Sequence, residues 1–516
     1  PGGAINIRTR RHRGGRSHQH IEASIGSFGT QGLRLDSFGE GVFWDHALVL
    51  NAQSSDNDFE YVNKNRAFNP ADPNREDKEE RNNAQSERAS VLLRLGYRPS
   101  GRQRWEGSVS YFNQDQGLPA LNNNAITRTQ LSTDDLLTQL RWSAFATQPN
   151  GWDHRLRLFH RNLGEIYDDR ASQIGLGSQH TKDSTTTTGA EWFASKPLGL
   201  HKLRSNLSWQ QEQYQSNNLL SGNRSPESER QTLAAGLELD FTLLDGRMTL
   251  TPALRLLSFE DVVTGRNNYE EDYLTPQAGM RYVLGEHSTL KANVGRYVRI
   301  PSFFEQLGDR GFIKGNPSLT EETSDNVDIG LEWDWLHTNS AWLTRSRLSL
   351  TAFANRLEDA IVYVFNSQGI GQALNVGEAE ITGAEISAEF SLRTATRIKL
   401  DFTGQDTENL SQVRAHHGKQ LPGRYSEALN LNIEQWLSSN TRLFYRYHAE
   451  RGIFYDQANL LEAKDRDEHD IGVAINWQSW DLSLEARNLK DENFESFNRY
   501  PEPGRSFWAS LGYTFR

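Results

Sequence analysis

Apolar and polar residues alternate with a strict period of two along this chain, from near residue 20 to its end. Successive side chains of a β-strand point to opposite faces, so the pattern predicts strands whose two faces meet different surroundings. In one segment Leu233, Ala235, Leu237, Leu239 and Phe241 share a face, opposite Gly236, Glu238 and Asp240. Hydrophobic residues make up only 36% of the 516 residues, which suits a sheet closed around a wet interior better than a packed core. We therefore predict an all-β fold, a transmembrane antiparallel β-barrel.

The connections between these segments alternate in length, which is a second and independent signal. Short turns rich in Gly, Asn, Asp and Ser are predicted near residues 39–41, 99–101, 149–151, 245–246, 285–286, 394–395, 438–440 and 479–480. Long polar connections are predicted around 54–84, 114–130, 162–182, 213–228, 259–272, 297–323, 364–371, 408–424, 455–467 and 490–502. Outer-membrane barrels have short periplasmic turns and long extracellular loops, and the count gives about 22 strands. Barrels of this size carry a plug in the lumen.

Composition excludes several other classes of protein. The net charge of −11 argues against a nucleic-acid-binding surface, and the absence of cysteine excludes disulfides and thiolate metal sites. The chain has no run of about 18 apolar residues, so a membrane crossing must use strands. A soluble β-propeller also alternates faces, but the repeat of about 40 to 50 residues that it requires is not present.

Aromatic residues cluster toward the ends of the predicted strands. The set comprises Trp105, Tyr111, Trp142, Trp192, Trp209, Trp333, Trp335, Tyr445, Tyr447, Trp477 and Trp480. Amphipathic rings suit the headgroup region of a bilayer, so we interpret the set as interfacial girdles, with packing within the sheet as the alternative.

Four segments, in order along the chain, resemble the TonB-dependent outer-membrane receptor family. The opening PGGAINI resembles the strand that closes the family's plug, through Gly2, Gly3 and Asn6. RIPSFFEQLGDRGFIKGNPSLTEETSDN resembles a central family stretch, through Arg299, Pro301, Asn316, Pro317 and Glu322. NVGEAEITGAE resembles a third, through Asn375, Gly377, Gly383 and Glu385, and the closing segment resembles the family's last signature, through Asn488, Leu489, Pro503, Gly504 and Phe515. The family usually ends on an aromatic residue, whereas Arg516 follows Phe515 here.

The resemblance implies an organisation and a function. We expect residues 1–16 to be the end of a plug domain and its linker, and residues 17–516 to be the barrel, so the chain reads as part of a longer protein. The family implies a monomeric receptor in the bacterial outer membrane, in contact with lipid and lipopolysaccharide, that imports a scarce chelate when the TonB energy-transducing complex acts on the plug. The family implies no enzymatic activity and no cofactor. It also implies that the motif residues have structural roles and do not bind the ligand.

Ligand contacts are expected in the long loops, where cations lie beside aromatic residues. Ferric siderophores are commonly anionic with planar groups, so charge-assisted hydrogen bonds and ring contacts would suit them. The candidates are Arg310, Phe312 and Lys314, then Phe497, Arg499 and Tyr500, and the adjacent His416 and His417, although such a pair in a polar loop is more often ordinary surface. The carboxylates of the 54–84 loop, among them Asp56, Asp58, Glu60, Asp72, Glu76 and Asp77, could bind calcium or form a solvated acidic surface.

Several rival functions stay open on the sequence. Cobalamin, ferric citrate, haem, a copper chelate or a sugar are alternative ligands within the family. A passive porin would have a smaller barrel without the PGGAINI segment. An outer-membrane enzyme would need a nucleophile motif such as G-x-S-x-G or a zinc motif such as H-E-x-x-H, and neither occurs.

Overall fold

The computed structural model describes residues 17–63, 78–119, 128–148, 150–175, 177–365 and 371–515. The segment with Gly2, Gly3 and Asn6 lies outside the described residues, and the expected boundary at residue 16 falls at their edge. Among the described residues, no helix is long and apolar enough to cross a membrane.

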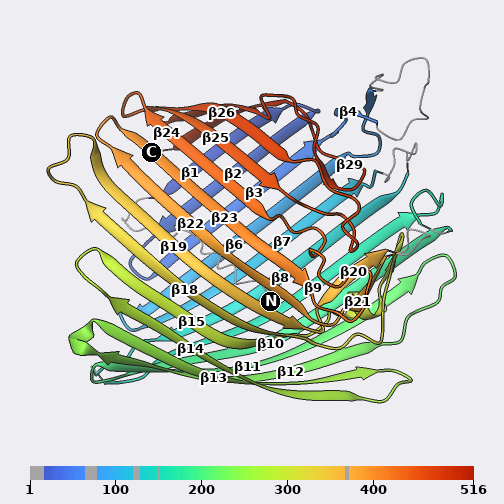
Figure 1. The fold of residues 1–516 in the computed structure, drawn as a ribbon, viewed down its shortest axis with the longest axis horizontal. Coiled ribbons are helices and arrows are strands. Elements are labelled where there is room, and N and C mark those ends of the chain that lie inside the picture. Colours follow the sequence, from blue (N-terminus) through green and yellow to red (C-terminus); the bar gives the residue numbers. More distant parts are fainter. Residues whose placement is uncertain are drawn as a thin grey trace.

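A single antiparallel sheet of 22 strands forms the barrel (Figure 1). Its first and last strands pair with each other, with Ile21 opposite Tyr513 and Ile25 opposite Ala509, so the sheet is a closed ring. The predicted barrel of about 22 strands is confirmed. The strands are β1 (His18–Gly26), β2 (Thr30–Glu40), β3 (Trp44–Ser55), β6 (Ser86–Ser100), β7 (Gln103–Gly117), β8 (Gln130–Ala144), β9 (Asp153–Asp169), β10 (Gln179–Leu198), β11 (His201–Asn218), β12 (Ser228–Leu243), β13 (Met248–Val263), β14 (Tyr269–Val283), β15 (Ser288–Arg299), β18 (Glu322–Leu336), β19 (Leu343–Glu358), β22 (Ala379–Leu392), β23 (Thr396–Asn409), β24 (Glu427–Trp436), β25 (Thr441–Arg451), β26 (Arg466–Trp477), β27 (Trp480–Arg487) and β30 (Ser506–Phe515).

The two ends of the barrel differ as the connection lengths predict. Short turns gather at one end, on the left of Figure 1, and the long connections gather at the other, which we call the long-loop end. Three short connections, at 27–29, 199–200 and 337–342, were not identified from the sequence, and the first of them lies at the long-loop end. The connection expected at 259–272 shrinks to 264–268, because β13 and β14 stay paired as far as Asp261 and Tyr269.

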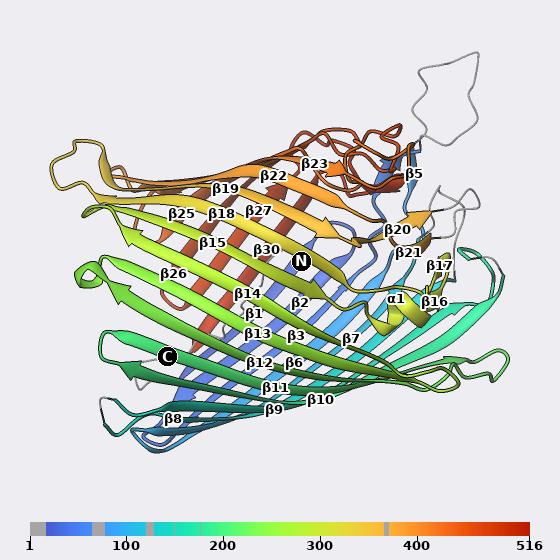
Figure 2. The same cartoon turned by 60° about the horizontal axis from the view of Figure 1, so that its bottom comes forward.

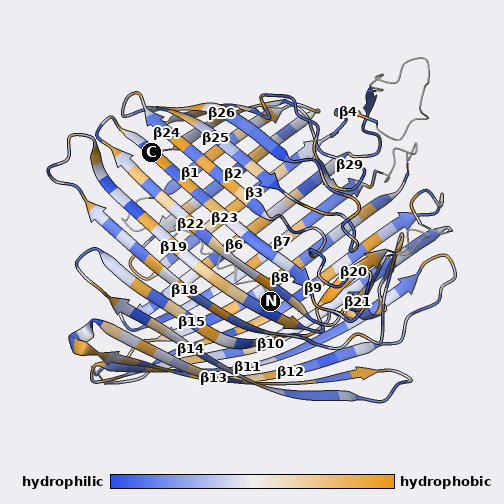
Figure 3. Ribbon diagram, viewed as in Figure 1, coloured by the Kyte–Doolittle hydropathy of each residue, from blue (hydrophilic) through white to orange (hydrophobic). Residues whose placement is uncertain are grey.

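Hydrophobic and hydrophilic residues alternate along the strands (Figure 3), so that one face of the sheet is apolar and the other is polar. Leu237, Leu254 and Leu256 are 55%, 46% and 57% exposed on the outer face, where only lipid can cover them. The predicted girdle residues Trp105, Trp192 and Trp477 share the outward parity of such leucines and are exposed as well.

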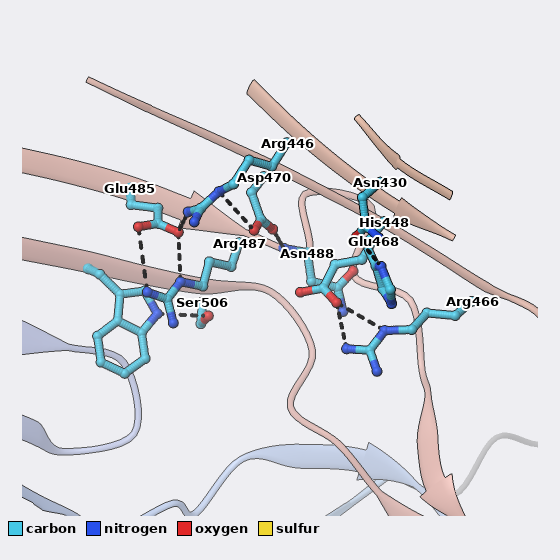
Figure 4. A network of polar contacts seen from close by, with 11 residues as sticks. Asn430, Arg446, His448, Arg466, Glu468, Asp470, Glu485, Arg487, Asn488 and Ser506 are labelled. Atoms are coloured by element: carbon cyan, nitrogen blue, oxygen red, sulfur yellow. Dashed lines mark hydrogen bonds and ion pairs between the residues drawn. The ribbon is translucent and has the colours of Figure 1, made fainter. Parts of the chain in front are cut away.

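Ion pairs and hydrogen bonds cover the inner wall. Asp45 of β3 accepts a charge-assisted hydrogen bond at 2.6 Å from Arg104 of β7. On β25, β26 and β27, Arg446 contacts both Asp470 and Glu485, and Arg487 donates to Glu485 at 2.8 Å (Figure 4). Charges removed from bulk water are stabilised by such pairing, so the lumen tolerates a wall of charged residues.

Smaller elements fill the long connections and therefore lie at the long-loop end (Figure 2). A four-stranded sheet combines segments from two of these connections, and two hairpins lie in two others. The elements are α1 (Phe303–Leu307), β16 (Asp309–Arg310), β17 (Ile313–Lys314), β20 (Ile361–Phe365) and β21 (Gly371–Asn375), with the hairpins β4 (Glu60–Val62) to β5 (Lys78–Glu80) and β28 (Glu495–Phe497) to β29 (Tyr500–Pro501).

Candidate ligand-binding face at the long-loop end

Residues 300–321, which we call the arm, connect β15 to β18 and begin with a capped helical turn. The hydroxyl oxygen of Ser302 accepts a hydrogen bond from the backbone N–H of Glu305, and the Glu305 carboxylate accepts one from the backbone N–H of Ser302 at 2.8 Å. This reciprocal capping box satisfies donors that a helix terminus leaves unpaired. Burial favours the neutral acid, but the hydrogen bonds from Ser302 and Arg299 outweigh it, so the pKa of Glu305 lies below its usual range.

Arg310 fastens the arm to the barrel wall. Its guanidinium lies 2.8 Å from the Glu165 carboxylate on β9 and 3.1 Å from that of Asp183 on β10. It also lies 4.8 Å from the ring centroid of Phe304. Burial alone would lower the pKa of Arg310, but the two carboxylates raise it, so the side chain stays charged. The guanidinium predicted to contact ligand is thus already engaged within the chain.

Arg230 of β12 forms a second clamp on the arm. Its guanidinium makes a bidentate ion pair with Asp261 of β13, with both contacts at 2.6 Å, and donates to the carbonyl of Pro301 at 2.7 Å. The Phe303 ring lies over the same guanidinium, at 4.8 Å from its central carbon. The two clamps together hold the arm inward against strands β9, β10, β12 and β13.

Phe312 and Lys314 lie in the middle of the arm. The carbonyl of Phe312 accepts from the backbone N–H of Gly371 at 2.8 Å, which joins the arm to β21. The side chain of Lys314 is exposed and pairs in register with Asp309. Burial raises the pKa of Asp309, and the charge of Lys314 opposes that rise. Lys314 is therefore the accessible cation of this predicted cluster.

Phe497 and Tyr500 stack on each other across the β28–β29 hairpin, with ring centroids 4.6 Å apart. Phe497 is 45% exposed, and Arg499, at the turn between them, is exposed too. Arg81, which the sequence reasoning missed, covers the Tyr500 ring at 4.4 Å and is only 4% exposed. Burial and the nearby Glu79 raise the pKa of Tyr61, the next ring under Arg81, to about 12.

His416 and His417 lie on a different connection, between β23 and β24. The Nδ1 atom of His417 lies 3.0 Å from the carbonyl oxygen of Ser411. The part of the chain that the structure describes contains no group of three or more His, Asp or Glu side chains that could hold a metal ion. Of the candidate calcium ligands, Asp56, Asp58 and Glu60 are exposed, and Asp72, Glu76 and Asp77 lie outside the described residues.

Residues of the two central family motifs connect the arm to neighbouring segments through hydrogen bonds. The side-chain amide of Asn375 donates to the carbonyls of Thr320 and Asp359 at 3.0 and 2.8 Å. That of Asn316 donates to the Ala373 carbonyl at 2.9 Å, and Glu322 accepts from the Ile361 N–H at 2.9 Å. Pro317, between these contacts, is exposed.

The remaining motif residues serve turns and close packing. Gly377 has φ of 80°, a backbone conformation that favours glycine, and a Cβ on Gly383 would lie 2.6 Å from the carbonyl oxygen of Gly404. Asn488 donates to the Glu492 carbonyl at 2.8 Å, in the loop that also contains Leu489, Pro503 and Gly504. Glu385 faces the lumen, and Phe515 is exposed on the last strand, opposite Gln19.

A second group that the sequence reasoning missed lies at the base of the arm. The hydroxyls of Tyr269 and Tyr273 on β14 both donate to Oε2 of Glu321, at 3.1 and 3.0 Å. The spacing of the two tyrosines places them on one face of a strand and could have been noticed. Their meeting with Glu321 depends on the fold of the arm.

Comparison with known proteins gives a family match over most of the chain. A family model described as "TonB dependent receptor-like, beta-barrel" matches residues 18–489. The ferric enterobactin receptor of Pseudomonas aeruginosa is 26% identical over 386 residues, which is 64% of this chain and 48% of the relative. The vitamin B12 transporter BtuB of Photobacterium profundum is 25% identical over 354 residues, which is 66% of this chain and 52% of the relative. The chain thus spans about half the length of the curated relatives it matches.

Solved structures share the fold at low sequence identity. The copper transporter OprC superposes with a TM-score of 0.78 at 14% identity, covering 98% of this chain and 81% of that one. The siderophore receptor PiuA from Acinetobacter baumannii gives a TM-score of 0.74 at 14% identity, covering 98% and 82%.

Proposed function

This chain belongs to the TonB-dependent receptor-like β-barrel family, and we propose that it forms the conducting barrel of an importer of ferric siderophores. Its location is the outer membrane of a Gram-negative bacterium. The proposal concerns the whole protein, of which this chain supplies the wall and the long-loop end.

The exposed cations and aromatic side chains of the long-loop end carry the proposal. Lys314, Phe497 and Arg499 are exposed there. Beside Phe497 and Arg499, the buried Arg81 packs on the ring of Tyr500. An anionic chelate with planar groups would gain charge-assisted hydrogen bonds and ring contacts from such residues. His416 and His417 are further candidates on the neighbouring connection. The ferric enterobactin receptor among the relatives favours the same class of ligand.

Uptake of a scarce ligand requires tight capture followed by forced release. Under the proposal, the long loops capture the chelate and the TonB complex acts on a plug inside the barrel to release it. Residues 1–16 would be the end of that plug, and the barrel would act as a monomer surrounded by lipid and lipopolysaccharide. No catalytic step or cofactor is part of the proposal.

Vitamin B12 is the second candidate ligand, because two of the relatives described as its transporters align with 66% and 44% of the chain. Cobalamin is bulky and its corrin macrocycle is planar, so the exposed aromatic residues alone do not exclude it. The exposed cations Lys314 and Arg499 favour the anionic ferric chelate over it.

Binding calorimetry on the full-length protein in detergent tests the proposal. Ferric enterobactin is the first probe and cyanocobalamin the second, with iron-free enterobactin as the control for the metal. We expect heat of saturable binding with the ferric chelate only. Saturable binding of cyanocobalamin alone would replace the ferric siderophore by vitamin B12 as the proposed ligand. Binding of neither probe would overturn the siderophore assignment, while the assignment of the barrel and its family would stand.

A further inference from the structure

Tryptophan rings, one imidazole and one ammonium group gather on the outer face of β7–β10, at the end with the short turns. Trp152, His154 and Trp192 form a stack, with ring centroids 6.3 and 5.9 Å apart and interplanar angles of 17° and 20°. The Nζ atom of Lys196 lies 5.6 Å from the centroid of the Trp152 ring, which is a cation–π contact. We call these four residues the aromatic patch. The rings of Trp105 and Trp142, 6.2 Å apart, extend it along the wall.

Strand register places the aromatic patch on the lipid side of the wall. Leu156 pairs with Trp192, so the two side chains share a face, and the exposed Leu158 continues that face along β9. Two carboxylates on the same stretch of strands have the opposite parity and face the lumen. There Glu106 accepts from Arg141 at 3.3 Å, and Glu191 accepts from Arg157 at 3.0 Å.

Lys196 is a cation on this outer face with no carboxylate to match it. Its one contact of charge within the part of the chain that the structure describes is with the Trp152 ring. The outward side chains next to it are Ala194 and Leu198 on β10 and Leu203 on β11, all of them apolar. The aromatic patch therefore has a positive charge that the described residues leave without a counter-charge.

The rings of the aromatic patch also have free hydrogen-bonding groups. Neither ring nitrogen of His154 forms a hydrogen bond with a described residue, and its Nδ1 atom is buried. The indole N–H groups of Trp152 and Trp192 form none within the described residues either. Indole and ammonium groups donate hydrogen bonds and cannot accept them. The aromatic patch thus supplies several donors and one positive charge, and it suits an anionic acceptor from outside the chain.

The level of the aromatic patch in the membrane indicates which acceptor that is. The short turns of an outer-membrane barrel face the periplasm, and aromatic rings at the edge of the apolar band lie among the lipid headgroups. A lysine stem can lie along apolar surface while its ammonium group stays at this level. The anion found there is the phosphate of a phospholipid, and a headgroup with a net negative charge complements Lys196.

We infer that the aromatic patch binds the headgroup phosphate of one anionic phospholipid from the periplasmic leaflet. Lys196 pairs with the phosphate, the neighbouring indole N–H groups donate to its oxygens, and the acyl chains lie along Leu156 and Leu158. The inference depends on the location of the barrel in the outer membrane and not on the identity of the transported ligand.

An aromatic girdle that only fills the interface is the competing explanation. Rings at a membrane interface need no particular lipid, because their amphipathic character alone suits the headgroup region. In that case anionic and zwitterionic phospholipids, which both have a phosphate and the same chains, would bind alike. Dependence on the net charge of the headgroup separates the two explanations.

Native mass spectrometry of the full-length protein in detergent tests the inference. The probes are phosphatidylglycerol, which is anionic, and phosphatidylcholine, which is zwitterionic, with identical acyl chains. We expect one phosphatidylglycerol to be retained at saturation and phosphatidylcholine to bind more weakly. Lys196→Gln should weaken the binding of phosphatidylglycerol about fivefold, and Lys196→Arg should preserve it. Circular dichroism verifies that each variant retains its strands.

Lys202→Gln is the matched control, because Lys202 lies across the same short turn but has the luminal parity of Arg204. This variant should bind phosphatidylglycerol as the parent protein does. Equal binding of the two lipids by the parent protein overturns the inference. Unchanged binding in Lys196→Gln, or the same loss in Lys202→Gln, also overturns it.

Discussion

Arg310 and Asp183 are 127 residues apart in the sequence, yet their side chains meet at 3.1 Å between the arm and strand β10. With Glu165, they form the contact that holds the arm against the wall. Replacing Arg310 by Met leaves two carboxylates without their cation, and breaking a buried ion pair costs about 3–5 kcal/mol. We expect faster amide hydrogen exchange across α1 and β16–β17 in Arg310→Met. Lys314→Met, which removes an exposed cation, should leave the rates unchanged, and equal rates in both variants would contradict the clamp.

The capped turn α1 should loosen in acid. The folded-state pKa of Glu305 is lowered from 4.5, so its contribution to stability is complete above that value and is lost as the pH falls through the folded pKa. Hydrogen exchange of the α1 amides should therefore accelerate relative to the barrel strands as the solution is acidified. In Glu305→Gln this acid-dependent step should disappear. An identical pH profile in both proteins would show that Glu305 does not cause the acid-dependent loosening of α1.

A charge should be tolerated on one face of β13 and not on the other. Leu254 faces lipid, and its neighbour Ala253 faces the lumen. Lys placed on the lipid face of a barrel costs about 2–4 kcal/mol near the middle of the bilayer. We expect Leu254→Lys to lower the free energy of unfolding from lipid vesicles, measured by urea titration, by about that amount. Ala253→Lys should change it far less, and equal losses would contradict the assignment of faces.

Gly383 should not accept a side chain. A Cβ there would lie 2.6 Å from the backbone oxygen of Gly404, which cannot move without disturbing the neighbouring strand. Overpacking of this kind costs about 1–3 kcal/mol. Thermal unfolding should show a lower transition temperature for Gly383→Ala. Gly107→Ala is the matched control in a strand, because nothing lies within 4 Å of its added Cβ.

Loss of an exposed cation at the long-loop end should weaken capture of a ferric siderophore. A hydrogen bond to a charged group contributes about 1.5–3 kcal/mol, and every 1.4 kcal/mol is a factor of ten in affinity. Lys314→Ala and Arg499→Ala should therefore each raise the dissociation constant of ferric enterobactin about tenfold or more. Lys202→Ala, at the opposite end of the barrel, should leave it unchanged. Unchanged affinity in both loop variants would show that Lys314 and Arg499 do not bind the ferric siderophore.

Much of the fold was predictable because its causes are local. The lipid-facing Leu254 and Leu256 alternate with Arg255 in any strand, whatever its neighbours, so the faces follow from the chain itself. Turn residues mark the short connections in the same way. The exception at residues 337–342 is informative, because Thr338, Asn339 and Ser340 are turn residues that were not recognised there.

The contacts of the candidate site were not predictable in the same way. Arg310 was selected for its charge, but only the folded arm brings it to Glu165 and Asp183. Arg81 was missed because its partner Tyr500 lies near the other end of the chain. Closure of the barrel brings together loop side chains that are far apart in the sequence. A local sequence pattern does not predict these contacts.

The seam between β1 and β30 has a consequence for biogenesis. His20 and Thr514, whose side chains meet there, are 494 residues apart, so this junction is completed only after every other strand of the ring has been synthesised. Until then the nascent polypeptide has two unsatisfied hydrogen-bonding edges, which are templates for aggregation. Prematurely terminated translation products should therefore be cleared by proteolysis rather than accumulate as smaller cylinders.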